Sequence, residues 1–119
     1  MTAPATATEV AKLLIGFGRD LHQIVQQLEA ADRDMVEKRA AADLAFSRAF
    51  MAAEGSVEAR RHLATIETHR QRLEAEVADA LVRHLRRRLD ATKTQVDIGR
   101  TWASALTSEL ALTNMGVDP

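Results

Sequence analysis

The chain of 119 residues contains no cysteine and no tyrosine, only one tryptophan and three phenylalanines, and only two prolines. Without cysteine, disulfide bonds and thiol chemistry are excluded, and a reducing compartment is compatible with the sequence. So few aromatic residues do not suit a compact globular core, but they are normal in a helical bundle built from Leu, Ile, Val and Ala. The formal net charge of −1 favours neither nucleic acid nor a membrane as partner.

Long hydrophobic runs are also missing. The longest extends only from Leu13 to Gly18, far below the roughly 20 apolar residues that span a bilayer. Residues 1–8 contain no Lys or Arg and no long apolar run, so they do not predict a secretory signal. We therefore expect a cytoplasmic protein that makes no membrane contact.

A helix stop and a helix start follow each other closely near the middle of the chain. Gly55 suits the left-handed position that ends a helix, and the hydroxyl of Ser56 can cap the next helix. The sequence therefore predicts an all-α fold, a long antiparallel helical hairpin that is completed into a bundle by oligomerisation. Its expected parts are a frayed segment 1–5, a first helix 6–53, a turn 54–56, a second helix 57–113 and a tail 114–119, all in one domain.

Apolar residues of the first helix recur at alternating steps of four and three, the heptad pattern of a coiled coil. Thr6 and Glu9 have the spacing of a capping box, which predicts the start of this helix. Gly16 and Gly18 interrupt the pattern and indicate either a kink or break, or a close helix contact that needs bare backbone. We call the residues at these steps the seam, the row that is expected to face the partner helix. The seam of the first helix continues to Ala52 and comprises Val10, Leu14, Phe17, Leu21, Ile24, Leu28, Ala31, Met35, Lys38, Ala42, Ala45, Ala49 and Ala52.

The second helix is expected to present a seam that begins at Leu63 and ends at Leu110. Successive steps of four between Val77 and Leu89 predict a stutter and local unwinding of the pair. The expected seam residues are Leu63, Ile66, Arg70, Leu73, Val77, Leu81, Leu85, Leu89, Thr92, Val96, Gly99, Ala103, Leu106 and Leu110.

The far end of the second helix carries more apolar surface than one partner helix can cover, because a second stripe runs beside the seam. A hairpin of two helices also buries little surface for the conformational entropy that it loses. We therefore expect a dimer or higher oligomer. The competing account is that residues 6–17 fold back over Trp102 within one chain. The predicted oligomer interface is Ile98, Trp102, Ala105, Leu106 and Leu110.

A basic strip on the second helix contains Arg83, Arg86, Arg87 and Lys93. Such a strip can be a solvated face that pairs with carboxylates three or four residues away. It can also contact the phosphates of a nucleic acid, or an acidic protein partner. All three interpretations remain open from the sequence.

No arrangement of residues indicates catalysis or ligand binding. The four histidines form no i,i+4 pair with one another and no metal-binding motif. No combination typical of nucleophilic catalysis can be assigned. We therefore expect no catalytic residues, no metal and no cofactor, and hence a protein that is not an enzyme.

Two stretches resemble a group of small helical proteins from the early regions of actinobacterial phages and prophages. They are residues 53–60 at the turn and residues 96–100 near the end, and the similarity covers residues 28–112. The resemblance implies an accessory role in phage DNA recombination or replication, and it carries over no active site. We expect a self-associating interaction protein with a further, unidentified protein partner. The alternatives are a nucleic-acid-binding protein that uses the basic strip, and a virion assembly or scaffolding component.

Overall fold

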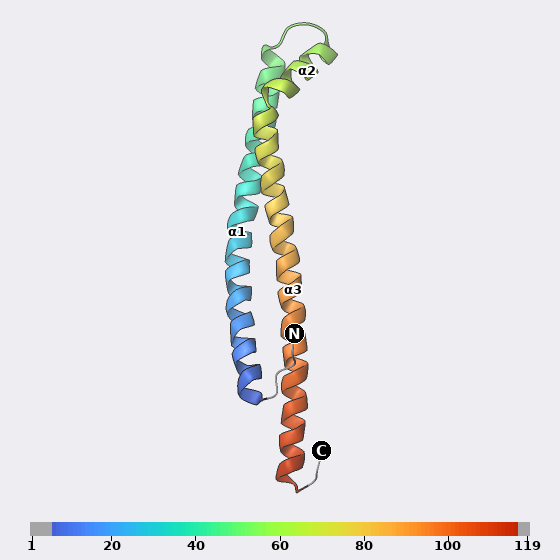
Figure 1. Ribbon diagram of the computed structural model, residues 1–119. Coiled ribbons are helices and arrows are strands. Elements are labelled where there is room, and N and C mark those ends of the chain that lie inside the picture. The colour runs from blue at the N-terminus through green and yellow to red at the C-terminus, as the bar shows by residue number, and fades with distance from the viewer. Residues whose placement is uncertain (1–5, 117–119) are drawn as a thin grey trace. The chain divides into compact units, whose positions relative to one another are not determined.

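The computed structural model describes residues 6–116 and contains three helices: α1 (Ala7–Ala52), α2 (Val57–Glu67) and α3 (His69–Asn114), with no strand in that range. Contacts divide the chain into two units. Unit 1 comprises Met1–Val25 and Arg87–Pro119, and unit 2 comprises Gln26–Arg86. Within each unit a stretch of α1 lies antiparallel to a stretch of α3 (Figure 1). The predicted all-α, antiparallel hairpin is therefore confirmed. The expected frayed segment 1–5 and the last residues of the expected tail lie outside the described range.

Helix α1 begins where the capping box predicts. The backbone N–H of Glu9 donates to the Thr6 hydroxyl oxygen at 3.2 Å, which satisfies an amide of the first turn. The helix then continues through Gly16 and Gly18, so the break considered from the sequence does not occur. A Cβ added at either glycine would meet no atom within 4 Å. Neither position therefore needs bare backbone for the packing of its own chain.

The turn between α1 and α2 has the predicted chemistry. Gly55 adopts a φ of +110°, which residues with a Cβ rarely adopt. The Ser56 hydroxyl accepts from the N–H of Ala59 at 3.2 Å and caps α2. Arg60 fastens α2 to the end of α1, because its Nε donates to the Phe50 carbonyl at 3.2 Å and its guanidinium lies 4.5 Å from the centre of the Phe50 ring.

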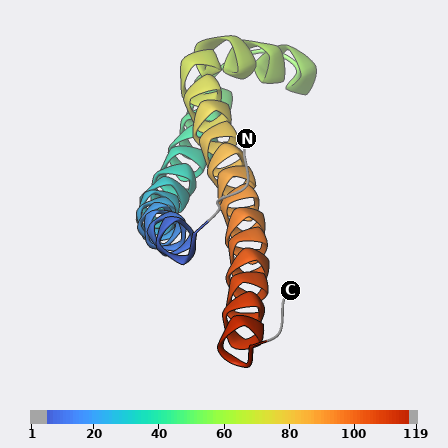
Figure 2. The ribbon, with the colours of Figure 1, turned by 60° about the horizontal axis from the view of Figure 1, so that its bottom comes forward.

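The prediction of one continuous second helix is wrong at Thr68, where α2 ends and α3 begins in a different direction (Figure 2). The buried Thr68 donates twice to the carbonyl of Ala64, from its N–H at 3.1 Å and from its hydroxyl at 2.7 Å. Nη2 of Arg72 donates to the Thr65 carbonyl at 2.8 Å. The Arg72 donor satisfies a carbonyl near the end of α2, and no glycine or proline lies at this break.

Burial along α1 follows the predicted heptad seam. Val10, Ile24, Ala31 and Ala42 are buried, and the seam positions between them are half-buried. The terminal seam position, Ala52, is exposed. The period of the apolar residues therefore identifies the inner face of this helix.

The seam predicted for the second helix, which the structure divides into α2 and α3, is wrong at the positions before Leu85. Leu73, Val77 and Leu81 are 49%, 63% and 47% exposed, whereas Ala75 and Val82 are buried. The observed seam alternates steps of four and three without a stutter, so the expected unwinding has no basis. It comprises Ala64, Thr68, Gln71, Ala75, Ala78, Val82, Leu85, Leu89, Thr92, Val96, Gly99, Ala103 and Leu106.

Each unit has its own small core. In unit 2, Leu28 and Met35 pack against the buried Ala31, Val82 and Leu85. Elsewhere in that unit several seam positions are alanines, whose small side chains let two helices approach closely.

In unit 1, Gly99 of α3 is buried against Leu14 of α1. A Cβ at Gly99 would lie 2.8 Å from Cδ2 of Leu14. This glycine therefore allows close packing of the two helices, whereas Gly16 and Gly18 have open space around them.

Candidate interaction surfaces

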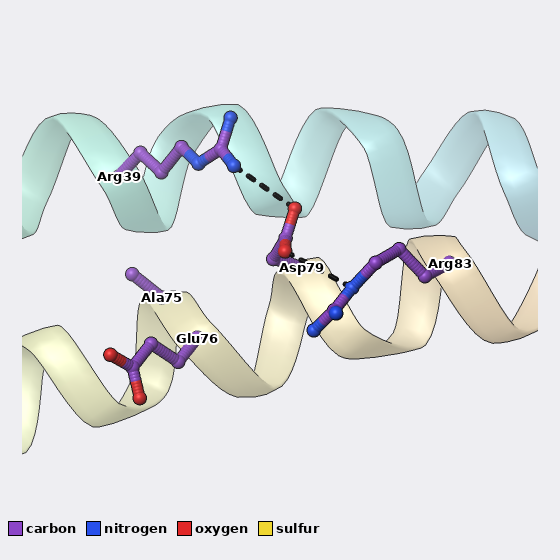
Figure 3. A pocket seen from close by; sticks show the side chains of 5 residues that line it. All are labelled: Arg39, Ala75, Glu76, Asp79 and Arg83. Carbon is purple, nitrogen blue, oxygen red and sulfur yellow. Dashed lines mark hydrogen bonds and ion pairs between the residues drawn. The ribbon is translucent and has the colours of Figure 1, made fainter.

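A network of charged side chains links α1 to α3 in unit 2 (Figure 3). The Asp79 carboxylate of α3 forms ion pairs with two arginines. Nη2 of Arg39 lies 3.0 Å from its Oδ1, and Nε of Arg83 lies 3.3 Å from its Oδ2. Glu76 lines the same hollow and has no ion-pair partner in the described part of the chain. The hollow is thus a site of ion pairing between the two helices of this unit.

A second pair lies further along the same two helices, with Nη2 of Arg86 at 3.6 Å from Oδ1 of Asp32. These side chains are partly exposed, and exposed pairs contribute about 0–1 kcal/mol each. Both ion pairs join residues next to the seam, and the two pairs lie on the same side of it. Their role is to hold the register of the helices, with little contribution to stability.

The predicted basic strip is therefore divided. Arg83 and Arg86, in unit 2, pair with carboxylates of their own chain, as the solvated, ion-paired interpretation predicts. Arg87 and Lys93, in unit 1, are exposed and have no ion-pair partner among residues 6–116. Asp90, a carboxylate three residues before Lys93, also forms no ion pair within those residues.

The first turns of α1 and the last turns of α3 form an apolar groove in unit 1. Val10 and Leu14 line it from α1, and Ala103, Leu106 and Leu110 line it from α3. Two of the five predicted interface residues, Leu106 and Leu110, therefore face α1 of their own chain. Leu106 is half-buried there and Leu110 is 56% exposed.

The other three predicted interface residues lie on a separate stripe of α3. Ile98 is 45% exposed, Trp102 is half-buried and Ala105 is exposed. They belong to a second heptad series beside the seam, which we call the outer stripe. The outer stripe comprises Arg88, Ala91, Gln95, Ile98, Trp102, Ala105 and Glu109.

The N-terminal segment of α1 packs on the seam of α3. The competing account placed residues 6–17 over Trp102, and this segment does pack on α3. It does so through Leu14, which lies against Gly99, and along the groove beside Leu106. Ile98, at 45%, and the exposed Ala105 remain accessible beside this occupied seam, whereas Trp102 is half-buried.

Unit 2 has an exposed apolar surface that sequence reasoning missed. It consists of Leu73, Val77 and Leu81, which were assigned to the seam. Their size suggested burial, but the smaller Ala75, Ala78 and Val82 take the buried positions. The sequence signal that could have identified the buried face is a strict alternation of steps of four and three. Only the smaller residues keep this alternation through the region.

The described residues give no indication of a metal site or a membrane span. No group of three or more His, Asp or Glu side chains among residues 6–116 could hold a metal ion. None of the three described helices is both long enough and apolar enough to cross a bilayer.

Comparison with known proteins does not assign a family. No protein-family model matches the chain, and neither a curated protein nor a solved structure matches it.

Proposed function

We propose that the protein is a non-enzymatic helical interaction protein whose copies associate through the outer stripe of α3. One observation carries the proposal: Ile98, 45% exposed, and Trp102, half-buried, form a partly exposed apolar centre beside a seam that α1 already covers. Trp102 is the only tryptophan of the chain, and tryptophan is enriched at the energetic centres of interfaces.

The weak cores of the two units support the same proposal. Nine apolar residues are buried in the described range, and five of them are alanines: Ala31, Ala42, Ala64, Ala75 and Ala78. Each buried methylene stabilises by about 0.8 kcal/mol, so alanines add little. A partner that covers Ile98 and Trp102 would add apolar burial that the single chain lacks.

Light scattering coupled to gel filtration tests the proposal. At tens of micromolar the wild type is expected to show at least twice the 13.1 kDa mass of one chain. Ile98→Asp should produce monomers, because it places a charge at the apolar centre of the stripe.

Ile15→Asp is the matched control. Ile15 is an exposed isoleucine of unit 1, at 59%, and it lies on α1, away from the outer stripe. This variant should assemble like the wild type, and circular dichroism should show equal helix content in both variants. A wild type that elutes as a monomer would contradict the proposal.

A second candidate function is nucleic-acid binding, and the unpaired Arg87 and Lys93 favour it. The ion pairs of Arg83 and Arg86 reduce the charge that this strip can offer to phosphates. Fluorescence anisotropy with oligonucleotides tests the idea. Phosphate contacts predict binding at about 50 mM salt that weakens steeply as salt rises, and an absence of binding at 50 mM ends this candidate.

The resemblance to phage early proteins directs the search for an outside partner. We propose proteins of phage recombination or replication as that partner, with the self-associated form as the accessory unit that they bind. Co-purification from the native host tests the choice, and a partner from the virion would favour the scaffolding alternative.

A further inference from the structure

The outer stripe of α3 has a nearly symmetric order of residue types. A charged residue stands at each end, with opposite signs, an alanine follows on the inside of each, and Ile98 stands in the middle. The midpoint between residues 88 and 109 lies half a residue from Ile98, about 0.75 Å along the helix. In order, the residues are Arg88, Ala91, Gln95, Ile98, Trp102, Ala105 and Glu109.

This order makes the stripe complementary to an antiparallel copy of itself. When Ile98 of one copy lies opposite Ile98 of the other, Arg88 of each copy lies opposite Glu109 of the other. Trp102 then lies beside Gln95, so the largest apolar group meets an uncharged side chain. A parallel arrangement would instead place Arg88 against Arg88 and Glu109 against Glu109, which like charges disfavour.

Both charges are free to pair with another molecule. Arg88 and Glu109 are exposed, and neither forms an ion pair within residues 6–116. Arg83, by contrast, is already paired within its own chain. α1 of the same chain packs on the seam through Leu14 and Gly99, and the outer stripe beside it keeps Ile98 45% exposed for a second copy.

We infer that two copies associate as a two-fold symmetric, antiparallel dimer through the outer stripe, with Arg88 of each copy paired to Glu109 of the other. The inference rests on the proposed self-association and adds the partner and the register. A two-fold interface is self-complementary, so each contact between unlike residues occurs twice. The two apolar centres pack together between the two ion pairs.

Charge reversal at the two ends tests the register, with sedimentation equilibrium of the full chain at low salt as the measurement. Arg88→Glu brings two carboxylates together at both symmetric contacts, and the dissociation constant of the dimer should rise about tenfold. Glu109→Arg should weaken the dimer to a similar extent. The combined variant R88E/E109R restores opposite charges at both contacts, and its dissociation constant should return to within about threefold of the wild type.

Lys93→Glu is the matched control, because it changes the net charge as much as Arg88→Glu does. Lys93 is exposed in the same unit and lies outside the outer stripe, so its reversal should change the dissociation constant by less than about twofold. A dimeric wild type whose affinity does not respond to either single reversal, or is not restored in the combined variant, overturns the antiparallel register and leaves self-association standing. A monomeric wild type overturns both.

Discussion

The glycines inside the helices differ in what surrounds them, and the difference decides what each one does. At Gly99 a Cβ would lie 2.8 Å from Cδ2 and 3.5 Å from Cγ of Leu14, whereas at Gly16 and Gly18 it would meet nothing within 4 Å. Gly99 thus permits the close approach of α1 and α3 in unit 1. The two glycines of α1 lower the stability of their helix without a packing gain in their own chain.

Two substitutions test this contrast. Gly18→Ala should raise the free energy of unfolding by about 0.5–1 kcal/mol, because alanine loses less backbone entropy in a helix. Gly99→Leu should lower it by about 1–3 kcal/mol, because the added atoms overpack the contact with Leu14. Urea denaturation followed by circular dichroism, at one fixed protein concentration, measures both. A destabilising Gly18→Ala would show that its neighbourhood is not open.

At the scale of the helix, the buried face of α3 in unit 2 is built from small residues. Val82 is 1% exposed and lies in the core with Leu85, whereas Val77 is 63% exposed on the outside. The same side chain therefore occupies both environments within two turns of one helix.

A pair of identical substitutions tests which face is buried. Val82→Ala should lower the free energy of unfolding by about 1.5–3 kcal/mol, because two buried methyl groups and their contacts are lost. Val77→Ala should change it by less than about 0.5 kcal/mol. Thermal and urea unfolding of the two variants compare them directly. Equal effects, or a larger effect at Val77, would show that the face with the larger side chains, Leu73, Val77 and Leu81, is the buried one.

The elements that could be predicted from sequence are those with local signals. The capping box at Thr6, the turn at Gly55 and Ser56, and the period of α1 each depend on residues close together in the chain, and the structure confirms them. The break at Thr68 could not be foreseen, because no glycine or proline marks it. The hydroxyl bond from Thr68 to Ala64 is also no signal, since Thr94 and Thr101 make the same kind of bond inside the continuous α3.

The seam predicted for the second helix was wrong before Leu85 because large side chains were taken to be buried. Leu73 and Leu81 are large and exposed, while Ala75 and Ala78 are small and buried. Which face of a helix is buried depends on the partner helix, and that information is not local. The five predicted interface residues fall on two different stripes for the same reason, because the position of α1 cannot be read from local sequence. Leu106 lines the groove with α1, whereas Ile98 does not.

At the scale of the whole molecule, α3 in unit 1 has two adjacent heptad series. One is occupied by α1, at Gly99 and Leu106, and the other is partly exposed, with Ile98 at 45% and Trp102 half-buried. A helix with two apolar stripes is typical of a bundle with more than two helices. We therefore propose that a second copy covers the outer stripe.

The single tryptophan allows the central claim to be measured at the interface itself. Trp102 is the only source of tryptophan fluorescence in the chain, so quenching by acrylamide reports its accessibility alone. As the protein concentration rises from about 0.1 to about 100 µM, quenching should weaken and the emission should shift to shorter wavelength, following the dimer population by mass action. In Ile98→Asp both signals should stay constant. Quenching of the wild type that does not change over this range would contradict self-association through the outer stripe.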